Sequence, residues 1–587
     1  MGTLSLVRMV RTRPLPERER AAVTGRIAWR DALLALLAYA LITAVMFWPV
    51  LRHIADSFPV DLGDPPNEAW LVAWGVHALT TNPSHLLGGN IYYPHAHALV
   101  YNDNMLGLLP LATPIFLASG GNAALTYNAL YLISFVLCGL GAFLLARQLT
   151  GSVAGAFLAG LIVAFSPYRM VHLSHLNQLS GEWLPLVLFF WERARRAADG
   201  ERPTRLWPSM IGMDLCFILQ ALCSIYYAVF LVVCLAIYLL LYMRMVGWAY
   251  ARRFAGAVAV AAVASFATLL PVLLPYLQLQ ERVDTVRGPL QVLYFAADVR
   301  DFLHMPTFSA LYGWTEQALG VPAHDAHQYL FPGLTVLVLA VLGWRWGRQR
   351  MEIRIYTILL FATAILALGR QLKMFDRVYN VPLPYALLYD HLPGFQSFRD
   401  PARFFYIGYL CLALLAAWGL GAWLERLREW RPARRAVLVA ALCLLVLAEY
   451  WIAPVATPRV AVGNTIPPAY RWLKAQPANT PVLELPIGQQ NAVIWSQQAL
   501  MTYYATYHWQ PIVNGVGGYT PGGYERDAAT LNRWPDPQAR RLLQHWGVEY
   551  VIWHGDWMSR PGPASSARTP LIRRWPDGIR LYRVVSG

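Results

Sequence analysis

Charged side chains are scarce in this sequence. Asp, Glu, Lys and Arg together make up 14% of the 587 residues, whereas hydrophobic residues make up 57% and the mean hydropathy is +0.38. About a quarter of the residues in a typical soluble protein are charged. The composition therefore excludes an ordinary soluble domain and predicts a polytopic membrane protein that lies in a lipid bilayer.

Lysine is almost absent. Lys373 and Lys474 are the only two lysines, so the net charge of +15 comes almost entirely from arginine. A nucleic-acid-binding protein would carry a basic soluble domain with interleaved aromatic residues, and none is visible. Arginine is concentrated in the cytoplasmic loops of membrane proteins, so we attribute the basic charge to topology and expect no nucleic-acid partner.

Sequence motifs for common chemistry are also missing. We find no nucleophile motif, no phosphate-cradling glycine loop, no zinc motif and no internal repeat. The cysteines lie in apolar runs without metal-ligand spacing, as is typical of small buried hydrophobic residues: Cys138, Cys216, Cys223, Cys234, Cys411 and Cys443. Metal ligands are therefore unknown from the sequence. No cofactor is certain, and a divalent metal ion stays open.

Apolar runs of membrane-spanning length are abundant. No small-residue cleavage site follows the first run, so we expect it to be an uncleaved span with the Arg-rich segment 1–30 in the cytoplasm. In all, we expect about eleven transmembrane helices, near residues 31–51, 122–147, 152–167, 179–192, 207–222, 225–243, 254–276, 329–344, 355–369, 403–424 and 436–453.

The distribution of arginine supports this count. With the N-terminus inside, four turns that are rich in arginine become cytoplasmic, namely 192–206, 244–253, 345–354 and 425–435. The same topology requires that the apolar run 105–119, which contains Pro110 and Pro114, does not cross the membrane. We therefore expect it to form an interfacial or re-entrant helix within a first outer loop that covers residues 52–121.

The predicted fold class is an all-α polytopic membrane bundle with a C-terminal extracytoplasmic α/β domain. A transmembrane domain covers 31–456, and 457–587 contains no membrane-length run. Strand-like pieces lie at 482–485, 549–553 and 581–585, with a helix-like piece at 537–546. The glycines of Asn514–Pro521 predict tight turns near a ligand or near the membrane domain.

The first outer loop is acidic although the chain is basic. It contains Asp61, Asp64, Glu68 and Asp103. A partly desolvated carboxylate at the mouth of a membrane cavity can act as a base near neutral pH. The alternative is structural, because Asp64 precedes two prolines and could cap a helix that continues to Trp74. Asp103 could cap the interfacial helix in the same way.

Two other outer segments carry polar groups at the membrane edge. Segment 165–185 contains Arg169, His172, His175, Asn177, Gln178 and Glu182. Such groups suit a cavity lining, and a cation there could stabilise a phosphate leaving group. The alternative is interfacial anchoring by Tyr168, Arg169 and Trp183.

Arg399 and Arg403 precede a span on its outer side, where arginine is unusual. They could bind a lipid phosphate through bidentate donors, or form salt bridges to the acidic loop. His95 and His97 could bind a metal or phosphate, but a solvated pair is favoured. Asp214 lies within a span, where an interhelical hydrogen bond is the simplest interpretation.

The pattern resembles the glycosyltransferase C (GT-C) superfamily of polytopic enzymes. The resemblance rests on the acidic motif Asp61-Leu-Gly-Asp64-Pro followed by Trp70, the interfacial helix, the basic inner turns and the outer domain. The chain is also similar to a group of uncharacterised bacterial multi-pass membrane proteins, through the segments SPYRMVHLSHLNQL, FRDPARF and LELP…NGVGGYTP.

The resemblance implies a membrane glycosyltransferase in the cell (inner) membrane, with its C-terminal domain periplasmic or extracellular. It would transfer a sugar, with inversion, from a polyprenyl-phosphate donor to a glycan, lipid or protein acceptor. The implied catalytic acid is Asp64 first and Asp61 second, with Asp103 as a further candidate. Unlike the adjacent acids of several relatives, Asp61 and Asp64 are three residues apart.

The remaining candidates are assigned to binding. Those for the donor phosphate are Arg399, Arg403, His172, His175 and Arg169, and those for substrate are Glu68, Trp70, Glu182 and Asn177. Two other functions share the same features. A transporter or flippase for a lipid-linked sugar would use the cavity without a base, and a non-catalytic envelope assembly protein would use the outer domain to bind a partner.

Overall fold

The computed structural model describes residues 28–201, 203–280, 283, 285–321, 328–452, 454–489, 491–558 and 561–585. In these residues, seven helical segments are long and apolar enough to cross a membrane. They comprise α2 (Trp29–Met46), α6 (Ala123–Thr150), α7 with α8 (Val153–Ala164 and Pro167–Val171), α11 (Leu206–Cys223), α12 (Ile225–Val246), α13 (Trp248–Gln280) and η7 with α19 (Pro401–Arg403 and Phe404–Arg426).

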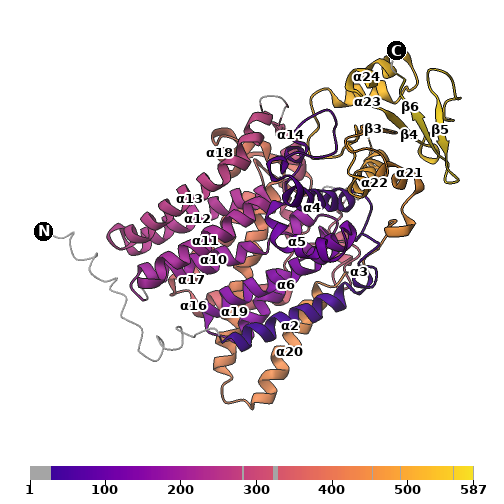
Figure 1. The fold of residues 1–587 in the computed structure, drawn as a ribbon. Helices are drawn as coiled ribbons and strands as arrows, with labels where there is room; N and C mark the ends of the chain where they lie inside the picture. Colours follow the sequence, from indigo (N-terminus) through magenta and orange to yellow (C-terminus); the bar gives the residue numbers. More distant parts are fainter. Residues whose placement is uncertain are drawn as a thin grey trace.

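The other four predicted spans are also helical but shorter or more charged. They correspond to α10 (Trp183–Ala198), α16 (Leu334–Gly347), α17 (Met351–Ala367) and α20 (Pro432–Glu449). These helices run alongside the longer ones in the bundle (Figure 1). The prediction of a helical membrane bundle is therefore confirmed, whereas the count of eleven spans stays a prediction.

Helix α19 lies at the centre of the bundle and packs against α7, α16 and α17. Every residue from Phe404 to Leu420 is buried. Helices α16 and α19 touch through Gly343 and Gly419: a Cβ atom on Gly343 would lie 1.9 Å from the carbonyl oxygen of Leu415. Small residues allow membrane helices to approach at backbone distance, which explains this contact.

Polar groups inside the bundle have partners. Ser265 of α13 donates to the Asp214 carboxylate of α11 at 2.8 Å, so the predicted interhelical hydrogen bond is confirmed. All six cysteines are free and buried, as expected for small apolar side chains.

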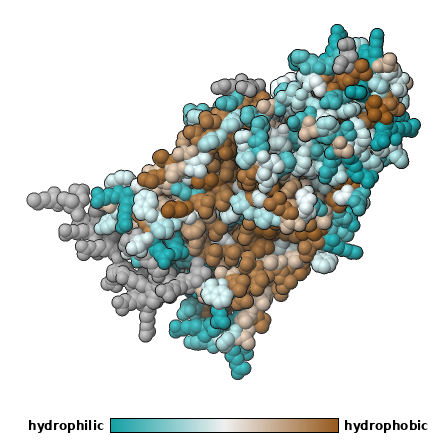
Figure 2. Space-filling model, viewed as in Figure 1, coloured by the Kyte–Doolittle hydropathy of each residue, from teal (hydrophilic) through white to brown (hydrophobic). Residues whose placement is uncertain are grey.

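The surface separates into an apolar belt and two hydrophilic ends (Figure 2). The C-terminal domain forms one end, and the turns α10–α11, α12–α13, α16–α17 and α19–α20 lie at the opposite end of the bundle (Figure 1). These are the four Arg-rich turns, so the structure places them together as the count of spans requires.

The first outer loop contains several short elements around two helices. Helix α4 (Asp64–Thr81) follows α3 (Trp48–Arg52), and α5 (Leu109–Ala118) follows η1 (Pro83–His85), η2 (Ala98–Tyr101) and η3 (Leu106–Leu108). The predicted helix at 105–119 is α5, which packs against α4 and α6. Helices α4 and α5 lie between the bundle and the C-terminal domain (Figure 1).

The connections from α13 to α16 and from α17 to α19 contain regular structure. They hold α14 (Pro289–Phe295), η5 (Val299–Phe302), α15 (Trp314–Ala318), the antiparallel strands β1 (Gln371–Met374) and β2 (Arg377–Pro382), α18 (Pro384–His391) and η6 (Phe395–Ser397).

The C-terminal segment forms a four-stranded sheet with helices. The strand order is β3-β4-β6-β5, in which β3 and β4 are parallel and the other pairs antiparallel. The three predicted strands are β3 (Val482–Leu485), β4 (Tyr550–His554) and β6 (Ile579–Arg583), and the predicted helix is α24 (Pro537–Trp546). The sequence did not predict β5 (Leu571–Arg574), η8 (Gly463–Thr465), η9 (Gly555–Trp557), α21 (Pro468–Lys474), α22 (Ala492–His508) and α23 (Tyr524–Leu531).

Backbone hydrogen bonds join the C-terminal segment to the first outer loop. Tyr92 N–H donates to the Asn514 carbonyl at 2.8 Å, and Tyr519 N–H donates to the Tyr101 carbonyl at 3.0 Å. A Cβ atom on Gly515 would lie 2.6 Å from the Tyr92 ring, so glycine is required where the two segments meet. The predicted proximity of the glycine-rich segment to the membrane domain is confirmed.

Candidate active site

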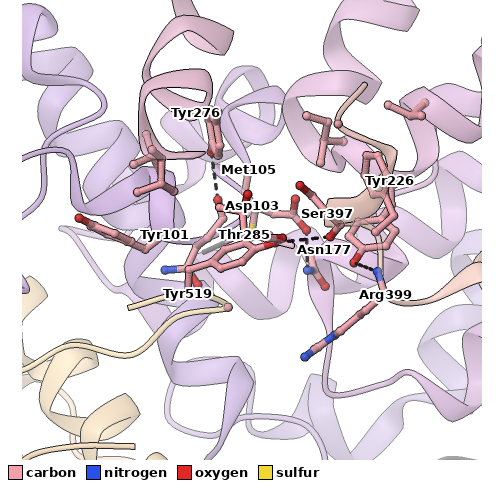
Figure 3. A pocket seen from close by; sticks show the side chains of 18 of the residues that line it. Tyr101, Asp103, Met105, Asn177, Tyr226, Tyr276, Thr285, Ser397, Arg399 and Tyr519 are labelled. Atoms are coloured by element: carbon pink, nitrogen blue, oxygen red, sulfur yellow. Dashed lines mark hydrogen bonds between the residues drawn. The ribbon is translucent and has the colours of Figure 1, made fainter. Parts of the chain in front are cut away.

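A cavity of about 550 Å³ lies where the first outer loop, the membrane helices and the C-terminal segment meet. Its polar wall is formed by Asp64, Asn67, Glu68, Asp103, His175, Asn177, Arg399 and Arg403. Its apolar wall includes Phe266, Leu270, Leu273 and Leu277, all from α13. Figure 3 shows how side chains from these separate elements converge on the cavity.

Asp64 is the first residue of α4, and Gly63 occupies the N-cap position. The Asp64 side chain makes no capping hydrogen bond, so the interpretation of Asp64 as a helix cap is wrong. Pro65 and Pro66 begin the helix at positions where no intrahelical N–H is needed. The carboxylate instead contacts His175, with 2.8 Å between Asp64 Oδ2 and His175 Nε2.

The environment of Asp64 favours its charged form. Burial alone would raise its pKa, but the hydrogen bond and charge of His175, the Trp495 indole and the charge of Arg399 outweigh burial. The pKa of Asp64 is therefore below its usual value. This differs from the desolvated carboxylate that the sequence led us to expect: Asp64 is ionised at neutral pH because its partners compensate for burial.

His175 is oriented by contacts on both ring nitrogens. Nε2 faces Asp64, and Nδ1 lies 3.0 Å from the Ser174 hydroxyl. In the matching tautomer, Nε2–H donates to the carboxylate and the Ser174 hydroxyl donates to Nδ1. His175 was predicted to bind the donor phosphate, but its contact in the structure is with the candidate base.

Glu68 lies one helical turn after Asp64 and lines the same cavity. Its carboxylate accepts the backbone N–H of Leu176 at 2.5 Å and that of Asn177 at 3.5 Å, at the start of α9 (Leu176–Leu179). Burial, with a further contribution from Asp64, raises its pKa well above the usual value. Glu68 therefore holds the segment that carries His175 in place.

Asp103 meets the same segment from the other side. Asn177 donates to Asp103 Oδ2 at 3.0 Å. Burial raises the pKa of Asp103, although Arg403 and Asn177 oppose this effect. Asn104, rather than Asp103, accepts the Leu106 N–H that begins η3, at 3.0 Å, so the capping alternative for Asp103 is wrong.

Asp61 does not line the cavity. Its Oδ1 accepts the Gly63 N–H at 2.7 Å, and the residue is exposed. Of the two acids in the motif, Asp64 is the one that faces the cavity.

Arg399 is a cation without an acidic partner in the described part of the chain. Its backbone N–H donates to the Tyr226 hydroxyl at 3.2 Å, and its guanidinium lies 4.9 Å from the centre of the Phe295 ring. Figure 3 shows the side chain extending away from Tyr226, with the guanidinium clear of the other labelled side chains. This arrangement leaves its donors available to an anion.

Arg403 is paired locally. Its Nε donates to Asp400 at 2.9 Å, and its guanidinium lies 4.2 Å from the centre of the Tyr226 ring. Within the described residues, neither Arg399 nor Arg403 forms an ion pair with an acid of the first outer loop. The salt-bridge interpretation of these two arginines is therefore wrong.

Arg169 and His172 do not reach the cavity. Arg169 is completely buried and donates to the carbonyls of Ala164 at 2.9 Å and Leu179 at 2.5 Å, so it neither binds a lipid phosphate nor anchors the interface. His172 Nδ1 lies 2.6 Å from the Tyr168 carbonyl, and burial lowers its pKa to about 3. His172 is therefore neutral and not a phosphate-binding cation.

Trp70 and Glu182 also lie outside the cavity lining. The Trp70 indole is fully buried and donates to Asn90 at 2.8 Å. Glu182 is 1% exposed at the start of α10. Both were predicted to bind substrate, but neither presents a surface that a substrate could reach. Asn177 is the predicted substrate residue that faces the cavity alongside Glu68.

The cavity also contains residues that the sequence did not predict. Trp495 comes from α22, and Tyr519 comes from the glycine-rich segment. Arg287 lies over the Tyr519 ring at 4.1 Å and donates to the Gly518 carbonyl at 2.8 Å. The glycine-rich motif was a signal for Tyr519, but no local pattern marks Trp495, Arg287 or Tyr226.

The described residues do not assemble a metal site: they contain no group of three or more His, Cys, Asp and Glu side chains placed to bind one ion. The Asp64–His175 pair supplies two donors without a third. His97 is exposed and His95 is half-buried, in agreement with the solvated interpretation. The divalent metal ion stays a prediction, and we derive no step through one.

Residues 35–449 match the sequence model of a family described as a domain of unknown function, DUF6311. The chain belongs to this family. No curated protein matches the sequence.

Solved structures give the fold relationship. The cryo-EM structure of the mycobacterial arabinofuranosyltransferase AftD is 13% identical with a TM-score of 0.52, and the match covers 96% of this chain. It covers 40% of AftD, so this DUF6311 chain spans less than half of AftD's length. The predicted resemblance to GT-C glycosyltransferases is therefore confirmed for the fold.

Two further solved structures match with TM-scores below that of AftD. The oligosaccharyltransferase AglB from Archaeoglobus fulgidus, in complex with an inhibitory peptide and a dolichol-phosphate, is 13% identical with a TM-score of 0.49, covering 89% of this chain and 69% of AglB. ArnT from Cupriavidus metallidurans, bound to undecaprenyl phosphate, is 12% identical with a TM-score of 0.48, covering 94% of this chain and 98% of ArnT.

Proposed function

We propose that this DUF6311 protein is a GT-C-type membrane glycosyltransferase. It takes a sugar from a polyprenyl-phosphate donor and transfers it to a glycan, lipid or protein of the cell envelope. One observation carries the proposal: a single cavity combines the ionised Asp64, an Arg399 guanidinium that has no acidic partner among the described residues, and an apolar wall from α13.

The apolar wall suits the lipid part of such a donor. Phe266, Leu270, Leu273 and Leu277 extend the cavity along a membrane helix, where a polyprenyl chain can pass between the protein and the bilayer. A phosphate at the head of that chain would lie near Arg399, whose planar donors suit phosphate oxygens. The fold of AftD, a glycosyltransferase, supports the same class of reaction.

The reaction we propose is a single inverting displacement. The Asp64 carboxylate accepts the proton of an acceptor hydroxyl, and the hydroxyl oxygen forms a bond to the anomeric carbon of the donor sugar. The bond between that carbon and the phosphate oxygen breaks on the opposite face. The polyprenyl phosphate leaves with the electron pair, and Arg399 stabilises its charge.

His175 and Trp495 are positioning residues in this scheme. Their contacts with the Asp64 carboxylate restrict its rotation and keep it ionised. A fixed carboxylate is aligned for proton transfer before the acceptor arrives.

We place the site on the outer face of the membrane. Trp495 and Tyr519 of the C-terminal segment line the cavity. The C-terminal domain lies at the end of the bundle opposite the four Arg-rich turns (Figure 1). The positive-inside bias assigns those turns to the cytoplasm, which leaves the cavity and residues 457–587 outside.

The test is the Asp64→Asn variant, which keeps the shape of the side chain but removes its basicity. We expect normal expression and normal binding of a polyprenyl-phosphate sugar, with transfer reduced by about 100-fold or more. Asp61→Asn is the matched control and should keep most of its activity, because Asp61 faces its own backbone. Transfer retained by Asp64→Asn would exclude Asp64 as the base.

A further inference from the structure

A second cavity, of about 560 Å³, shares no lining residue with the candidate active site. It lies between the first outer loop and the C-terminal domain. One side is formed by the end of α4 and the turn between α5 and α6, and the other by the start of the C-terminal domain and by α22. Nothing in the transfer mechanism uses it.

Aromatic side chains form much of its wall. Tyr503, Tyr504, Tyr507 and Trp509 come from α22 and its C-cap, and His77 comes from α4. Trp509 and His77 are stacked, with ring centres 3.9 Å apart and planes 9° from parallel. A stacked pair fixes both rings, so that a ligand meets a preformed platform.

Polar groups alternate with these rings. Thr80, Ser119, Asn122 and Thr506 also line the cavity. The wall therefore differs from the continuous apolar wall of α13 in the candidate active site. Alternating aromatic faces and hydroxyl or amide groups match a sugar ring, which has an apolar C–H face and a polar rim.

Lys474 is the only charged residue among the described residues that line this cavity. Its Nζ lies 4.2 Å from the centre of the Tyr507 ring. Burial lowers the pKa of His77, so this residue is neutral near pH 7. No acidic residue is in the described lining, so the cavity favours a ligand with negative charge.

The rim is open. A Cβ atom on Gly120 or on Gly463 would meet nothing within 4 Å. Gly120 belongs to the turn that follows α5, and Gly463 belongs to the C-terminal segment. Both glycines are exposed, so the wall of the cavity reaches the surface of the molecule there.

We propose that this cavity is a binding site for a saccharide that carries an anionic group, a carboxylate or a phosphate. The sugar rings lie against Tyr507 and Trp509, and the anionic group lies near Lys474. The proposal does not depend on transfer at Asp64, since the two cavities are separate. It gives the C-terminal domain a role in holding a glycan.

The test compares three soluble tetrasaccharides by titration calorimetry on the full-length protein in neutral detergent. Maltotetraose is neutral, tetragalacturonate carries carboxylates and the chitosan tetramer carries amines. We expect tetragalacturonate to bind most tightly and the chitosan tetramer least. Equal affinity for all three, or binding of none at millimolar concentration, would overturn the proposal.

Charge reversal locates the site. Lys474→Glu should weaken tetragalacturonate binding at least about fivefold while leaving maltotetraose within about twofold. Arg471→Glu is the matched control: it is exposed on the same helix, does not line the cavity and should bind all three as wild type does. Identical effects of the two variants would contradict a site at Lys474.

A third variant tests the aromatic wall. Tyr507→Ala should weaken the binding of all three saccharides by up to about tenfold. Asp64→Asn should bind the saccharides normally, which separates this proposal from the proposed transfer. If Lys474→Glu instead weakens only the binding of vesicles that contain phosphatidylglycerol, the ligand is a lipid head group and the saccharide proposal is wrong.

Discussion

In the pair formed by Asp64 and His175, burial and hydrogen bonding shift the pKa of the Asp64 carboxyl in opposite directions. Burial raises the pKa of Asp64, whereas His175 and Trp495 lower it, and the lowering prevails. Asp64 Oδ2 and His175 Nε2 lie 2.8 Å apart in the cavity wall. A substitution of His175 should therefore change the pKa of the proposed base without removing the base.

We predict that His175→Ala shifts the acidic limb of the pH dependence of kcat/KM to higher pH. The imidazole makes the largest contribution that lowers the pKa of Asp64. Without it that pKa rises, so a greater fraction of Asp64 is protonated as the pH falls. The measurement is the rate of transfer across a pH series. His172→Ala is the control, since His172 bonds to Tyr168 and lies outside the cavity. If the acidic limb of the pH dependence is the same in His175→Ala as in the wild type, the pair does not set the pKa of the base.

Glu68 gives a prediction about stability. Its pKa in the folded state is raised well above the ordinary value of 4.5. Its contribution to the free energy of unfolding is therefore fully present below about pH 4.5 and is lost as the pH rises through the folded-state value. At neutral pH, Glu68→Gln should be as stable as the wild type or more so, because the amide oxygen can still accept the Leu176 N–H.

Glu68→Ala should behave differently from Glu68→Gln. It leaves the start of α9 without an acceptor, so we expect a loss of about 1–2 kcal/mol in the free energy of unfolding. Thermal unfolding in detergent, at pH values on both sides of neutrality, checks both variants. Equal stability of the Gln and Ala variants would contradict the capping role of Glu68.

At the scale of elements, α13 has two faces with different surroundings. Leu270 and Leu273 line the candidate active site, whereas Val263 is 70% exposed on the outside of the helix. Only the first face would contact a polyprenyl chain in the proposed complex. A large apolar side chain should therefore obstruct the donor on one face and be harmless on the other.

We predict that Leu270→Trp raises the KM for the polyprenyl-phosphate sugar at least about tenfold by filling the apolar wall. The substitution adds bulk without adding charge, so insertion into the membrane is preserved. Val263→Trp is the matched control on the same helix and should leave the KM unchanged. If the two variants bind the donor equally well, the lipid does not lie along α13.

At the scale of the whole molecule, the apolar belt and the two hydrophilic ends determine how the chain sits in a bilayer (Figure 2). Trp495 and Tyr519 of the C-terminal segment line the candidate active site, so it lies at the end of the molecule that holds the C-terminal domain. The side of the membrane on which this end lies decides whether the proposed reaction is extracytoplasmic, and it can be measured directly. All six natural cysteines are buried, so they give little background in a labelling experiment.

We predict that Asn464→Cys reacts with an impermeant maleimide in intact cells and that Glu429→Cys reacts only after the membrane is opened. Both residues are exposed, the first in the C-terminal segment and the second in the Arg-rich turn between α19 and α20. Labelling of Glu429→Cys in intact cells would reverse the orientation and remove the basis for an outer-face transferase.

The sequence by itself determined the membrane character, the position of every helix predicted as a span and the end of the bundle that carries arginine. These follow from apolar runs and charge, which are local properties of the chain. Strand-like patterns were enough for β3, β4 and β6. The acidic motif also directed attention to Asp64, but it gave no reason to prefer the lowered pKa that the structure shows.

Only the tertiary structure decided which polar residues face the cavity. The sequence presented Arg169 and His172 as surface cations, yet packing buries Arg169 completely and His172 in part, and neither lines the cavity. Arg399, in the same kind of setting, has no acidic partner among the described residues. Trp495 reaches Asp64 from more than 400 positions away along the chain. Contacts between distant segments depend on how helices and loops pack together, and neither composition nor spacing encodes that packing locally.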